Sequence, residues 1–342
     1  MTDLSIAVVG AGLVGRRHAE LIARHASLAA LVDPAPVTAD LASALGTRHF
    51  ATLEDCLDGT SLDGVIVATP NQLHVAHARA CIERNLPVLI EKPIADNSDS
   101  AAGLVAFAAE KSVPILVGHH RRHNPLIAAA RSIIAAGQLG DIVAINGQFW
   151  LYKPDDYYSQ AWRRQKGAGP VFINLIHDID LLRHLCGDIL AVQAMQSGKT
   201  RGFDVEDTAA ILLEFESGAL GTFSVSDTVV APWSWEFTAG ENPAYPNVAT
   251  SAYQIGGTRA SLSLPDMVVW KHPEARSWWN PIEQSRVPAE DRDALEEQCR
   301  HFLKVCGGVP PLVDGAEGLK SLRAIEAIRT AAETGQKVRL DP

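Results

Sequence analysis

A glycine-rich turn close to the N-terminus constrains the fold of this chain more than any other feature. Residues 4–9 are a short apolar and β-branched run, and the motif Gly10–Gly15 (G-A-G-L-V-G) follows directly, where a helix over 13–24 is expected to begin. In a strand–turn–helix unit the first glycine permits a tight turn, the second lets backbone N–H groups approach a pyrophosphate, and the third lets the helix pack closely on the strand. The motif therefore predicts an α/β domain that binds a dinucleotide at a helix N-terminus.

The order of the remaining segments predicts two kinds of domain. Up to about residue 117, short apolar runs alternate with helical stretches, which is typical of βαβ units and a parallel sheet. The pattern changes after Pro125. Longer alternating segments, which we expect to be antiparallel strands with one wet face, follow at 142–150, 190–197, 208–215 and 219–226.

Two glycines and two helical stretches complete the expected second domain. Gly218 lies where a hairpin turn would join two of the strands. A single helix is expected over 171–185, and a long amphipathic helix over 316–334 is expected to end at Gly335.

Length and composition support this division and exclude several classes of function. A chain of 342 residues is too long for one ordinary core, and its 47% hydrophobic and 20% charged residues are typical of a globular protein. A formal charge of −10 argues against a nucleic-acid surface or a basic membrane patch. We expect no signal peptide and no membrane span, and the five cysteines, which lack C-x-x-C spacing, are expected to be reduced thiols in a cytoplasmic protein.

Asp33 follows the second predicted strand, eighteen residues after Gly15. A carboxylate at this place can accept hydrogen bonds from the adenosine ribose and would repel a 2′-phosphate. The next residues, 34–36, supply no arginine for such a phosphate. NAD is therefore favoured over NADP, and the alternative is that Asp33 only caps a turn.

The segment Thr69-Pro70-Asn71 closes the next apolar strand, and His74 follows on the expected helix. The chain is expected to pass under the nicotinamide ribose here. Asn71 could instead be an N-cap of the helix, and His74 could be structural.

Glu91-Lys92-Pro93 follows the buried run 88–90, at the carboxyl edge of the predicted sheet. Open α/β sheets bind their ligands at this edge, and a lysine there can polarise an oxygen or relay a proton. Pro93 favours an extended backbone at Lys92. Lysine is usually a solvated surface residue, but its place between Glu91 and a proline favours a role in a site.

A polar stripe runs along the otherwise apolar helix expected over 171–185. Asn174, His177 and Asp180 are spaced three residues apart and would share one face. Such polar groups are either hydrogen-bonded internally or line a cleft, and three in a row favour the cleft. A metal site is not expected, because no third well-spaced ligand joins His177 and the aspartates.

Two further segments are candidates for the site. Arg121 or Arg122, in the run 118–125 that joins the domains, could bind a cofactor phosphate or a substrate oxygen, or form an interdomain salt bridge. The stretch 228–250, rich in Trp, Pro and Asn, is expected to be an ordered loop that shapes a pocket.

Together these motifs resemble the Gfo/Idh/MocA family, which includes glucose–fructose oxidoreductase, inositol dehydrogenase and a rhizopine-catabolism protein. The resemblance runs nearly end to end, through Gly10–Gly15, Thr69–Asn71 with His74, Glu91–Pro93, Arg121–Pro125, Trp162–Arg163, His177–Asp180 and Ala331–Gly335. It implies a Rossmann NAD-binding domain over 1–122. It also implies a substrate-binding and oligomerisation α/β domain over 123–342, with a large, mostly antiparallel open sheet and a final helix that packs back toward the first domain.

The family further implies that Lys92 and His177 are the catalytic pair and that the sheet joins dimers or tetramers. The sequence departs from the family in two places. Many members carry an aspartate four residues before the histidine, where this chain has Ile173, so that Asn174 could replace it only as a hydrogen-bonding group. Many also carry three glycines where this chain has 167–170 (G-A-G-P).

The resulting expectation is an NAD-dependent oxidoreductase that transfers a hydride between the cofactor and a secondary alcohol of a sugar, a cyclitol or a related cyclic diol. His177 would be the general base, Lys92 would stabilise the alkoxide, and Asp180 would orient the imidazole or bind a substrate hydroxyl. The alternatives are an NAD-assisted glycoside hydrolase and a non-catalytic NAD-binding regulator. Expected cofactor-binding residues are Gly10, Gly12, Leu13, Val14, Gly15, Asp33, Thr69, Pro70, Asn71, His74, Glu91, Lys92 and Arg122; expected catalytic and substrate-binding residues are Lys92, Asn174, His177, Asp180, Tyr152, Lys153, Trp162 and Arg163.

Overall fold

Two β-sheets organise the chain, and each is the centre of its own unit in the computed structural model, which describes residues 4–290 and 292–340. The first unit comprises the described residues up to His123 together with Arg292–Leu322, and the second comprises the rest. The segment Arg292–Leu322, which lies in the predicted second domain, is thus grouped with the first unit. The functions expected of the two domains stay predictions.

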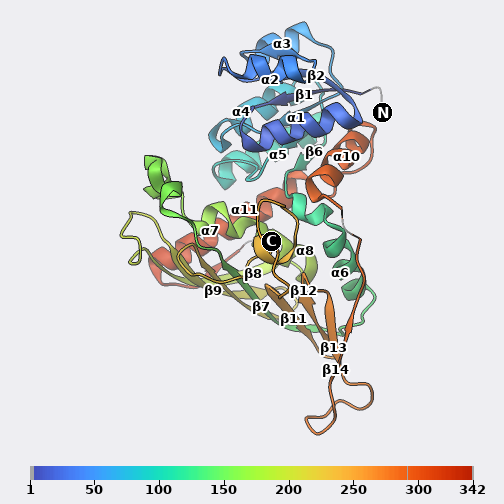
Figure 1. Ribbon diagram of the computed structural model, residues 1–342, viewed down its shortest axis with the longest axis vertical. Coiled ribbons are helices and arrows are strands. Elements are labelled where there is room, and N and C mark those ends of the chain that lie inside the picture. Colours follow the sequence, from blue (N-terminus) through green and yellow to red (C-terminus); the bar gives the residue numbers. More distant parts are fainter. Residues whose placement is uncertain (1–3, 291, 341–342) are drawn as a thin grey trace. The chain divides into compact units, whose positions relative to one another are not determined.

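Six parallel strands form the sheet of the first unit, in the order β3-β2-β1-β4-β5-β6. This is the strand order of a Rossmann domain, and the predicted parallel sheet is confirmed. Its strands β1, β2 and β6 are labelled in Figure 1. Most of its residues are buried, as in a parallel sheet covered by helices, which explains the short apolar runs in the sequence. The strands are β1 (Ser5–Val9), β2 (Ser27–Val32), β3 (Arg48–Phe50), β4 (Gly64–Val67), β5 (Val88–Ile90) and β6 (Ile115–Val117).

Helices alternate with these strands along the first part of the chain. One further helix of this unit comes from much later in the sequence. That helix, α10, contacts α1 and the short helix η1, which explains why it is grouped with this unit. Asp293 is the N-cap of this helix, and its side chain accepts hydrogen bonds from Leu295 N and Glu296 N. The helices are α1 (Leu13–His25), α2 (Thr38–Ala44), α3 (Leu53–Gly59), α4 (Asn71–Ile82), α5 (Ser98–Lys111), η1 (His120–His123) and α10 (Ala294–Cys306).

Nine strands form the sheet of the second unit, in the order β14-β13-β12-β11-β7-β10-β9-β8-β15. Its pairs are antiparallel except for β7 and β10, which are parallel. The prediction of a mostly antiparallel sheet is confirmed, and β7 with β10 is the parallel exception. Strands β8, β9 and β10 form an antiparallel meander, and its last strand, β10, lies beside β7. The strands are β7 (Ile142–Trp150), β8 (Ile189–Ser197), β9 (Thr208–Phe215), β10 (Leu220–Ser226), β11 (Tyr253–Gly257), β12 (Ala260–Leu264), β13 (Val268–Lys271), β14 (Glu283–Arg286) and β15 (Val338–Arg339).

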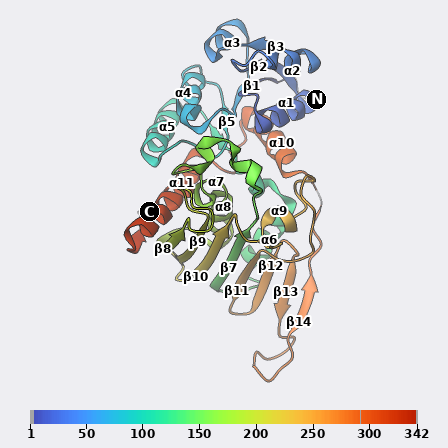
Figure 2. The same ribbon diagram turned by 60° about the vertical axis from the view of Figure 1, so that its left-hand side comes forward.

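Helices lie against one face of this sheet (Figure 2). The helix expected over 171–185 is broken at Asn174 into α7 and α8, so the prediction of one continuous helix is wrong. Gly218 and Gly335 have φ of 86° and 69°, and the predicted hairpin turn at Gly218 and the predicted helix end at Gly335 are confirmed. The helices are α6 (Pro125–Ala135), η2 (Asp155–Ser159), η3 (Ala161–Arg164), α7 (Pro170–Ile173), α8 (Leu175–Cys186), α9 (Trp235–Thr238) and the end of α11 (Gly315–Thr334), whose first part belongs to the first unit.

Two sequence expectations concern the chain as a whole. No helix in the described part of the chain has both the length and the apolar character that crossing a membrane requires. All five cysteines are free thiols.

Candidate active site

Backbone packing requires two of the three glycines in the turn after β1. Gly10 has φ of 91°, donates its N–H to Val32 O at 2.7 Å, and lies so close to β4 that a Cβ would be 2.6 Å from Ala68 O. A Cβ on Gly15 would lie 1.9 Å from Gly10 O. Only glycine therefore lets α1 start this close to β1 and β4.

Gly12 differs, because nothing in the described structure requires it to be glycine. Its φ is −65°, and a Cβ there would meet no atom within 4 Å. It is the N-cap of α1, where no side chain caps the first N–H groups, and Leu13 beside it is 91% exposed. The open space beside uncapped N–H groups fits a pyrophosphate, so the residues present fit the predicted dinucleotide.

Asp33 ties this turn to the end of β2. Its Oδ2 accepts a hydrogen bond from Ala11 N at 2.8 Å, and its Oδ1 accepts one from Ala35 N at 2.8 Å. Asp33 therefore caps a turn, which is the alternative role that the sequence left open for it. Each carboxylate oxygen can accept a further hydrogen bond, so a contact with a ribose hydroxyl stays a prediction.

The segment after β4 is held by His74. Its Nδ1 lies 2.8 Å from Pro93 O and its Nε2 lies 2.8 Å from Thr69 O, so the ring links the loops after β4 and β5. Burial lowers the pKa of His74, and the two backbone carbonyls act in the opposite direction. The structural role expected as an alternative for His74 is confirmed. The N-cap role considered for Asn71 is wrong, because α4 starts at Asn71 itself and no side chain caps it.

Glu91 is buried behind Lys92 at the end of β5. Its Oε1 lies 2.7 Å from His18 Nε2, and its Oε2 accepts a hydrogen bond from Lys92 N at 3.2 Å. The other ring nitrogen of His18 lies 3.3 Å from Cys299 Sγ on α10. Gly118 makes room for this carboxylate, since a Cβ there would lie 2.9 Å from it. Glu91 therefore fixes the backbone from which Lys92 projects, and its expected contact with the cofactor stays a prediction.

The two buried groups stabilise each other's charge. Burial alone would lower the pKa of His18, but its contacts with Cys299 and Glu91 outweigh burial and raise it to about 10. Burial alone would raise the pKa of Glu91, but the hydrogen bond and charge of His18 outweigh it and lower this pKa to about 2. The pair is therefore ionised at neutral pH.

Arg122 is buried at the end of η1, and its Nη1 lies 3.0 Å from Glu317 Oε2 on α11. Glu317 belongs to the first unit, so this ion pair is internal to that unit rather than interdomain. A contact of Arg122 with a cofactor phosphate stays a prediction.

In the second unit, His177 lies in the first turn of α8 and is 9% exposed. Its N–H donates to Asn174 O at 3.1 Å, across the break between α7 and α8. Asp180 is buried one turn later on the same helix. The predicted helical stripe therefore holds for His177 and Asp180, whereas Asn174 lies at the helix junction.

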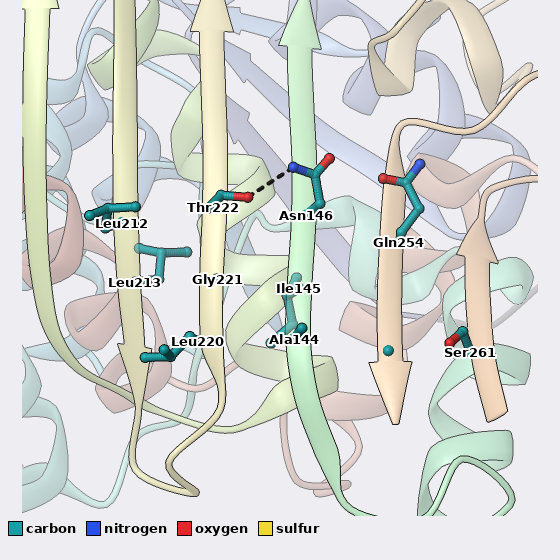
Figure 3. Close-up of a pocket in the computed structure, with 11 residues that line it drawn as sticks. Ala144, Ile145, Asn146, Leu212, Leu213, Leu220, Gly221, Thr222, Gln254 and Ser261 are labelled. Carbon is teal, nitrogen blue, oxygen red and sulfur yellow. Dashed lines mark hydrogen bonds between the residues drawn. The ribbon is translucent and has the colours of Figure 1, made fainter. Parts of the chain in front are cut away.

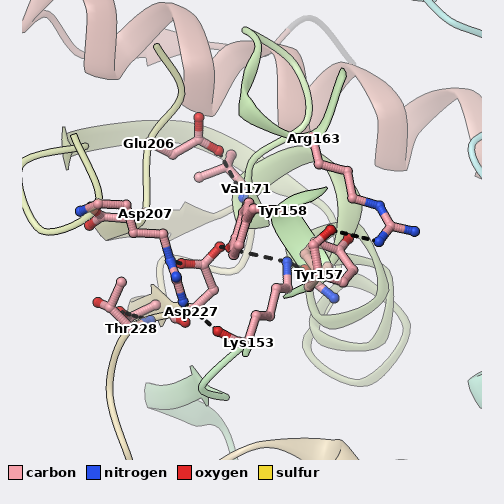
Figure 4. A network of polar contacts seen from close by, with 12 residues as sticks. Lys153, Tyr157, Tyr158, Arg163, Val171, Glu206, Asp207, Asp227 and Thr228 are labelled. Atoms are coloured by element: carbon pink, nitrogen blue, oxygen red, sulfur yellow. Dashed lines mark hydrogen bonds and ion pairs between the residues drawn. The ribbon is translucent and has the colours of Figure 1, made fainter. Parts of the chain in front are cut away.

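A buried polar network supports this junction (Figure 4). Lys153, which follows β7 and is 6% exposed, donates from Nζ to Asn174 Oδ1 at 2.8 Å and lies 3.7 Å from Asp227 Oδ2. Burial lowers the pKa of Lys153. Tyr158 donates its hydroxyl to Asp227, and Arg201 donates from Nε to the other oxygen of this carboxylate at 3.1 Å.

The carboxylate of Glu206 supports the start of α7. It accepts a hydrogen bond from Val171 N at 3.1 Å, and burial raises its pKa. A Cβ on Gly169 would lie 2.1 Å from this carboxylate. Gly169, which lies in the segment 167–170 where the sequence departs from the family, therefore leaves room for the carboxylate of Glu206.

Three expected wall residues lie in the segment after β7. Tyr152 is half exposed, with the Arg201 guanidinium 5.6 Å from its ring centre, and Trp162 is half exposed as well. Arg163 stacks on the Tyr157 ring at 4.0 Å and donates to Tyr157 O at 2.8 Å, so its described contacts hold the loop. Their contacts with a substrate stay predictions.

Sequence reasoning missed Asp227, Arg201, Tyr158 and Glu206. A signal for Asp227 was present, because it follows directly on β10, just as Asp207 directly precedes β9. Ser226 is paired with Trp150 of β7 and with Thr208 of β9, so these strand ends lie at one edge of the sheet. Recognising this would have required knowing that β7 and β10 are parallel neighbours.

The first unit has the strand order, the glycine turn and the open helix N-terminus of a dinucleotide-binding Rossmann domain, which places the chain in the class of dinucleotide-binding proteins. Residues 4–119 match the model of an oxidoreductase family with an NAD-binding Rossmann fold, and residues 127–263 match the GFO/IDH/MocA C-terminal domain. The chain belongs to the GFO/IDH/MocA family, and the resemblance noted in the sequence is confirmed.

Known relatives cover much or all of the chain. It is 26% identical over 298 residues to 1,5-anhydro-D-fructose reductase of Ensifer adhaerens, covering 86% of this chain and 84% of that protein. It is 29% identical over 228 residues to inositol 2-dehydrogenase of Leifsonia xyli subsp. xyli, covering 64% of this chain and 65% of that protein. The crystal structure of the WlbA dehydrogenase from Bordetella pertussis, in complex with NADH and UDP-GlcNAcA, is 25% identical, with a TM-score of 0.79 and complete coverage of both chains.

Proposed function

We propose that this protein is an NAD-dependent dehydrogenase that acts on a secondary alcohol of a sugar, a cyclitol or a related cyclic diol. The observation that carries the proposal lies in the first unit. Lys92 is the second residue after β5, at the same carboxyl edge of the sheet as the open turn at Gly12 after β1. Ligands of open α/β sheets bind at this edge. The relatives named for an anhydrosugar and a cyclitol support the substrate class.

Each proposed residue has a chemical role that its type can perform. His177 accepts the proton of the substrate hydroxyl, and Lys92 stabilises the negative charge that develops on the oxygen. Bound NAD supplies the hydride acceptor. Asp180 orients the imidazole or binds a second hydroxyl, and Asn174 can form hydrogen bonds but cannot take a proton.

Replacing Lys92 tests the proposal directly. Lys92→Ala should lower the rate of NADH formation by about 100-fold or more, the usual scale of acid–base assistance, while NAD binding persists. The matched control is Lys111→Ala, which removes an exposed lysine at the end of α5. Near-normal turnover by Lys92→Ala in a screen of cyclic polyols would exclude this lysine from the reaction.

The same screen separates the two alternatives. An NAD-assisted glycoside hydrolase would release a sugar from a glycoside without net formation of NADH. A non-catalytic regulator would bind NAD and turn over no polyol. Absorbance of NADH together with analysis of the sugar products distinguishes all three.

We further propose that the exposed face of the nine-stranded sheet joins copies of this chain into a homodimer or homotetramer. The apolar side chains of Met195, Leu212 and Leu220, on β8, β9 and β10, are 77%, 54% and 63% exposed. Leu212 and Leu220 border a depression of about 560 Å³ whose rim includes Asn146 and Gln254 (Figure 3). A broad, mostly uncharged face of this kind is typical of a buried interface, and the second copy is the occupant that the family resemblance implies.

A charge placed in the middle of this face tests the assembly. Leu212→Glu should convert the oligomer to monomers, because assembly would bury an unpaired carboxylate. Light scattering after size-exclusion chromatography measures the mass. Val309→Glu, at an exposed position outside the second unit, is the control. A wild-type protein that is monomeric at micromolar concentration would contradict the proposal.

We also propose a cytoplasmic location, which the five unpaired thiols support, because disulfides are common in oxidising compartments.

A further inference from the structure

Asn174 has an N-cap position without N-cap hydrogen bonds. It is the residue before α8, where an asparagine side chain usually accepts a hydrogen bond from an N–H of the first turn. Here the side chain makes no cap, and its Oδ1 accepts a hydrogen bond from Lys153 Nζ instead. The start of α8 therefore lacks the side-chain cap that an asparagine could provide.

Lys153 fixes which way round the Asn174 amide lies. An ammonium group has only hydrogens to offer, so the amide oxygen must face it and the amide nitrogen must face away. Asn174 is partly exposed, and its amide nitrogen has no hydrogen-bond partner within residues 4–290 and 292–340. The group presented beside His177 is therefore a donor with two N–H bonds.

Lys153 is buried, and its surroundings compensate its charge. A buried ammonium loses its hydration, and burial lowers the pKa of Lys153 accordingly. It is compensated by Asn174 Oδ1, by Asp227 at 3.7 Å and by the Tyr157 ring at 5.0 Å. Arg201 donates to Lys153 O at 2.6 Å, and Lys153 N donates to Asp227 O at 2.9 Å, so the backbone at Lys153 is fixed as well. Buried charged groups with shifted pKa values cluster at functional sites, which supports a role for this amide in a site.

We propose that Asn174, oriented by Lys153, determines substrate specificity by donating a hydrogen bond to a carboxylate or ester carbonyl oxygen near the reacting carbon. Such an oxygen is a stronger acceptor than a hydroxyl oxygen, which can accept the same hydrogen bond but more weakly. Lys153 is the positioning residue, and Asn174 contacts the substrate. The inference deepens the proposed function and rests on it for the place of the reacting carbon beside His177. An aspartate at 174 would present an acceptor and would favour a hydroxyl instead.

The experiment measures binding rather than turnover, so that its failure can be distinguished from a failure of the proposed hydride transfer. The full-length protein is saturated with NADH and titrated calorimetrically with three matched cyclic probes: glucuronate, its methyl ester and glucose. The wild type should bind glucuronate and the ester about 10-fold or more tightly than glucose, the scale of one directed hydrogen bond. Glucuronate and its methyl ester differ in charge, so comparing their affinities shows whether binding depends on the charge or only on an acceptor oxygen.

Two variants assign the preference to the two residues. Asn174→Asp should abolish or reverse the preference, because a carboxylate replaces the donor and repels glucuronate. Lys153→Met should reduce it by about 10-fold, since the amide is then free to turn. Lys166→Met removes an exposed lysine of the same segment and should leave the ratio unchanged. General damage to the fold would weaken all three probes alike, so the ratio of affinities is the informative quantity.

Several outcomes would overturn the inference. These are equal wild-type affinity for all three probes, no detectable binding of any probe, or an unchanged ratio in Asn174→Asp. If Lys153→Met does not fold, Asn174→Asp and Asn174→Ala carry the test alone. Loss of hydride transfer in Lys92→Ala with the binding ratio intact would leave both this inference and the proposed function standing.

Discussion

A buried charged group supports the segment that carries each proposed catalytic residue, but the two arrangements differ in which hydrogen-bonding atoms they leave available. Behind Lys92, Glu91 and His18 neutralise each other, and the second ring nitrogen of His18 contacts Cys299. Beside His177, Lys153 uses only one atom of the Asn174 amide and leaves the other open. The first arrangement is closed and can only hold a backbone in place, whereas the second is half open and can also contact a ligand.

A second difference concerns two glycine positions next to the proposed site residues. At Gly10 and Gly15, in the turn after β1, a Cβ would strike main-chain atoms. At Gly169, before α7, a Cβ would strike the side-chain carboxylate of Glu206. Backbone constraints tolerate no substitution, while a side chain can move or be replaced together with its neighbour.

A large effect on stability is expected when the buried His18 loses its counter-ion. Glu91→Gln leaves a buried imidazolium without its counter-ion and should lower the free energy of unfolding by about 3–5 kcal/mol. Chemical denaturation measures the change. The double variant His18→Gln with Glu91→Gln should recover part of the loss, because two amides can hydrogen-bond without charge. A loss of the same size in the double variant would show that the charge of His18 is not the cause.

The closed pair also predicts a pH dependence. The lowered pKa of Glu91, about 2, means that its contribution is complete above its ordinary pKa of 4.5 and is lost as the pH falls toward 2. The raised pKa of His18, about 10, means that its contribution is complete below its ordinary pKa of 6.5 and is lost as the pH rises toward 10. The difference in melting temperature between the wild type and Glu91→Gln should therefore be largest between pH 4.5 and 6.5 and should shrink on both sides.

An intermediate effect is expected where a side chain, not the backbone, sets the constraint. Gly169→Ala should displace Glu206 from Val171 N and cost about 1 kcal/mol, the usual worth of a helix cap. The control is Glu206→Ala, in which adding Gly169→Ala should cost little more because the obstructing carboxylate is gone. A full additional loss in that double variant would place the constraint in the backbone after all.

The contrast between closed and open arrangements also explains what the sequence could predict. The parallel sheet and the glycine turn follow from local patterns, since apolar runs and a G-x-G-x-x-G motif specify one βαβ unit at a time. The polar network beside His177 depends on β7 and β10 being parallel neighbours, a pairing between residues far apart in the chain. The break at Asn174 was hidden for the same reason, because the helical pattern continues through it and the lysine that holds its side chain lies 21 residues earlier.

The smallest effect on stability, and the most specific effect on binding, is expected at Gly12. Its φ of −65° suits alanine, and a Cβ would meet no atom, so Gly12→Ala should change the free energy of unfolding by less than about 0.5 kcal/mol. The added methyl group would occupy the space in which a pyrophosphate approaches the N–H groups at the start of α1, so NAD affinity should fall at least 10-fold.

Gly15→Ala, whose Cβ would lie 1.9 Å from Gly10 O, is the matched control and should lose the folded state together with NAD binding. Titration of NADH fluorescence with thermal unfolding of each variant separates the two effects. Unchanged NAD affinity in Gly12→Ala would mean that the open space beside Gly12 is not the place of the pyrophosphate, and that the first unit constrains its turn for packing alone.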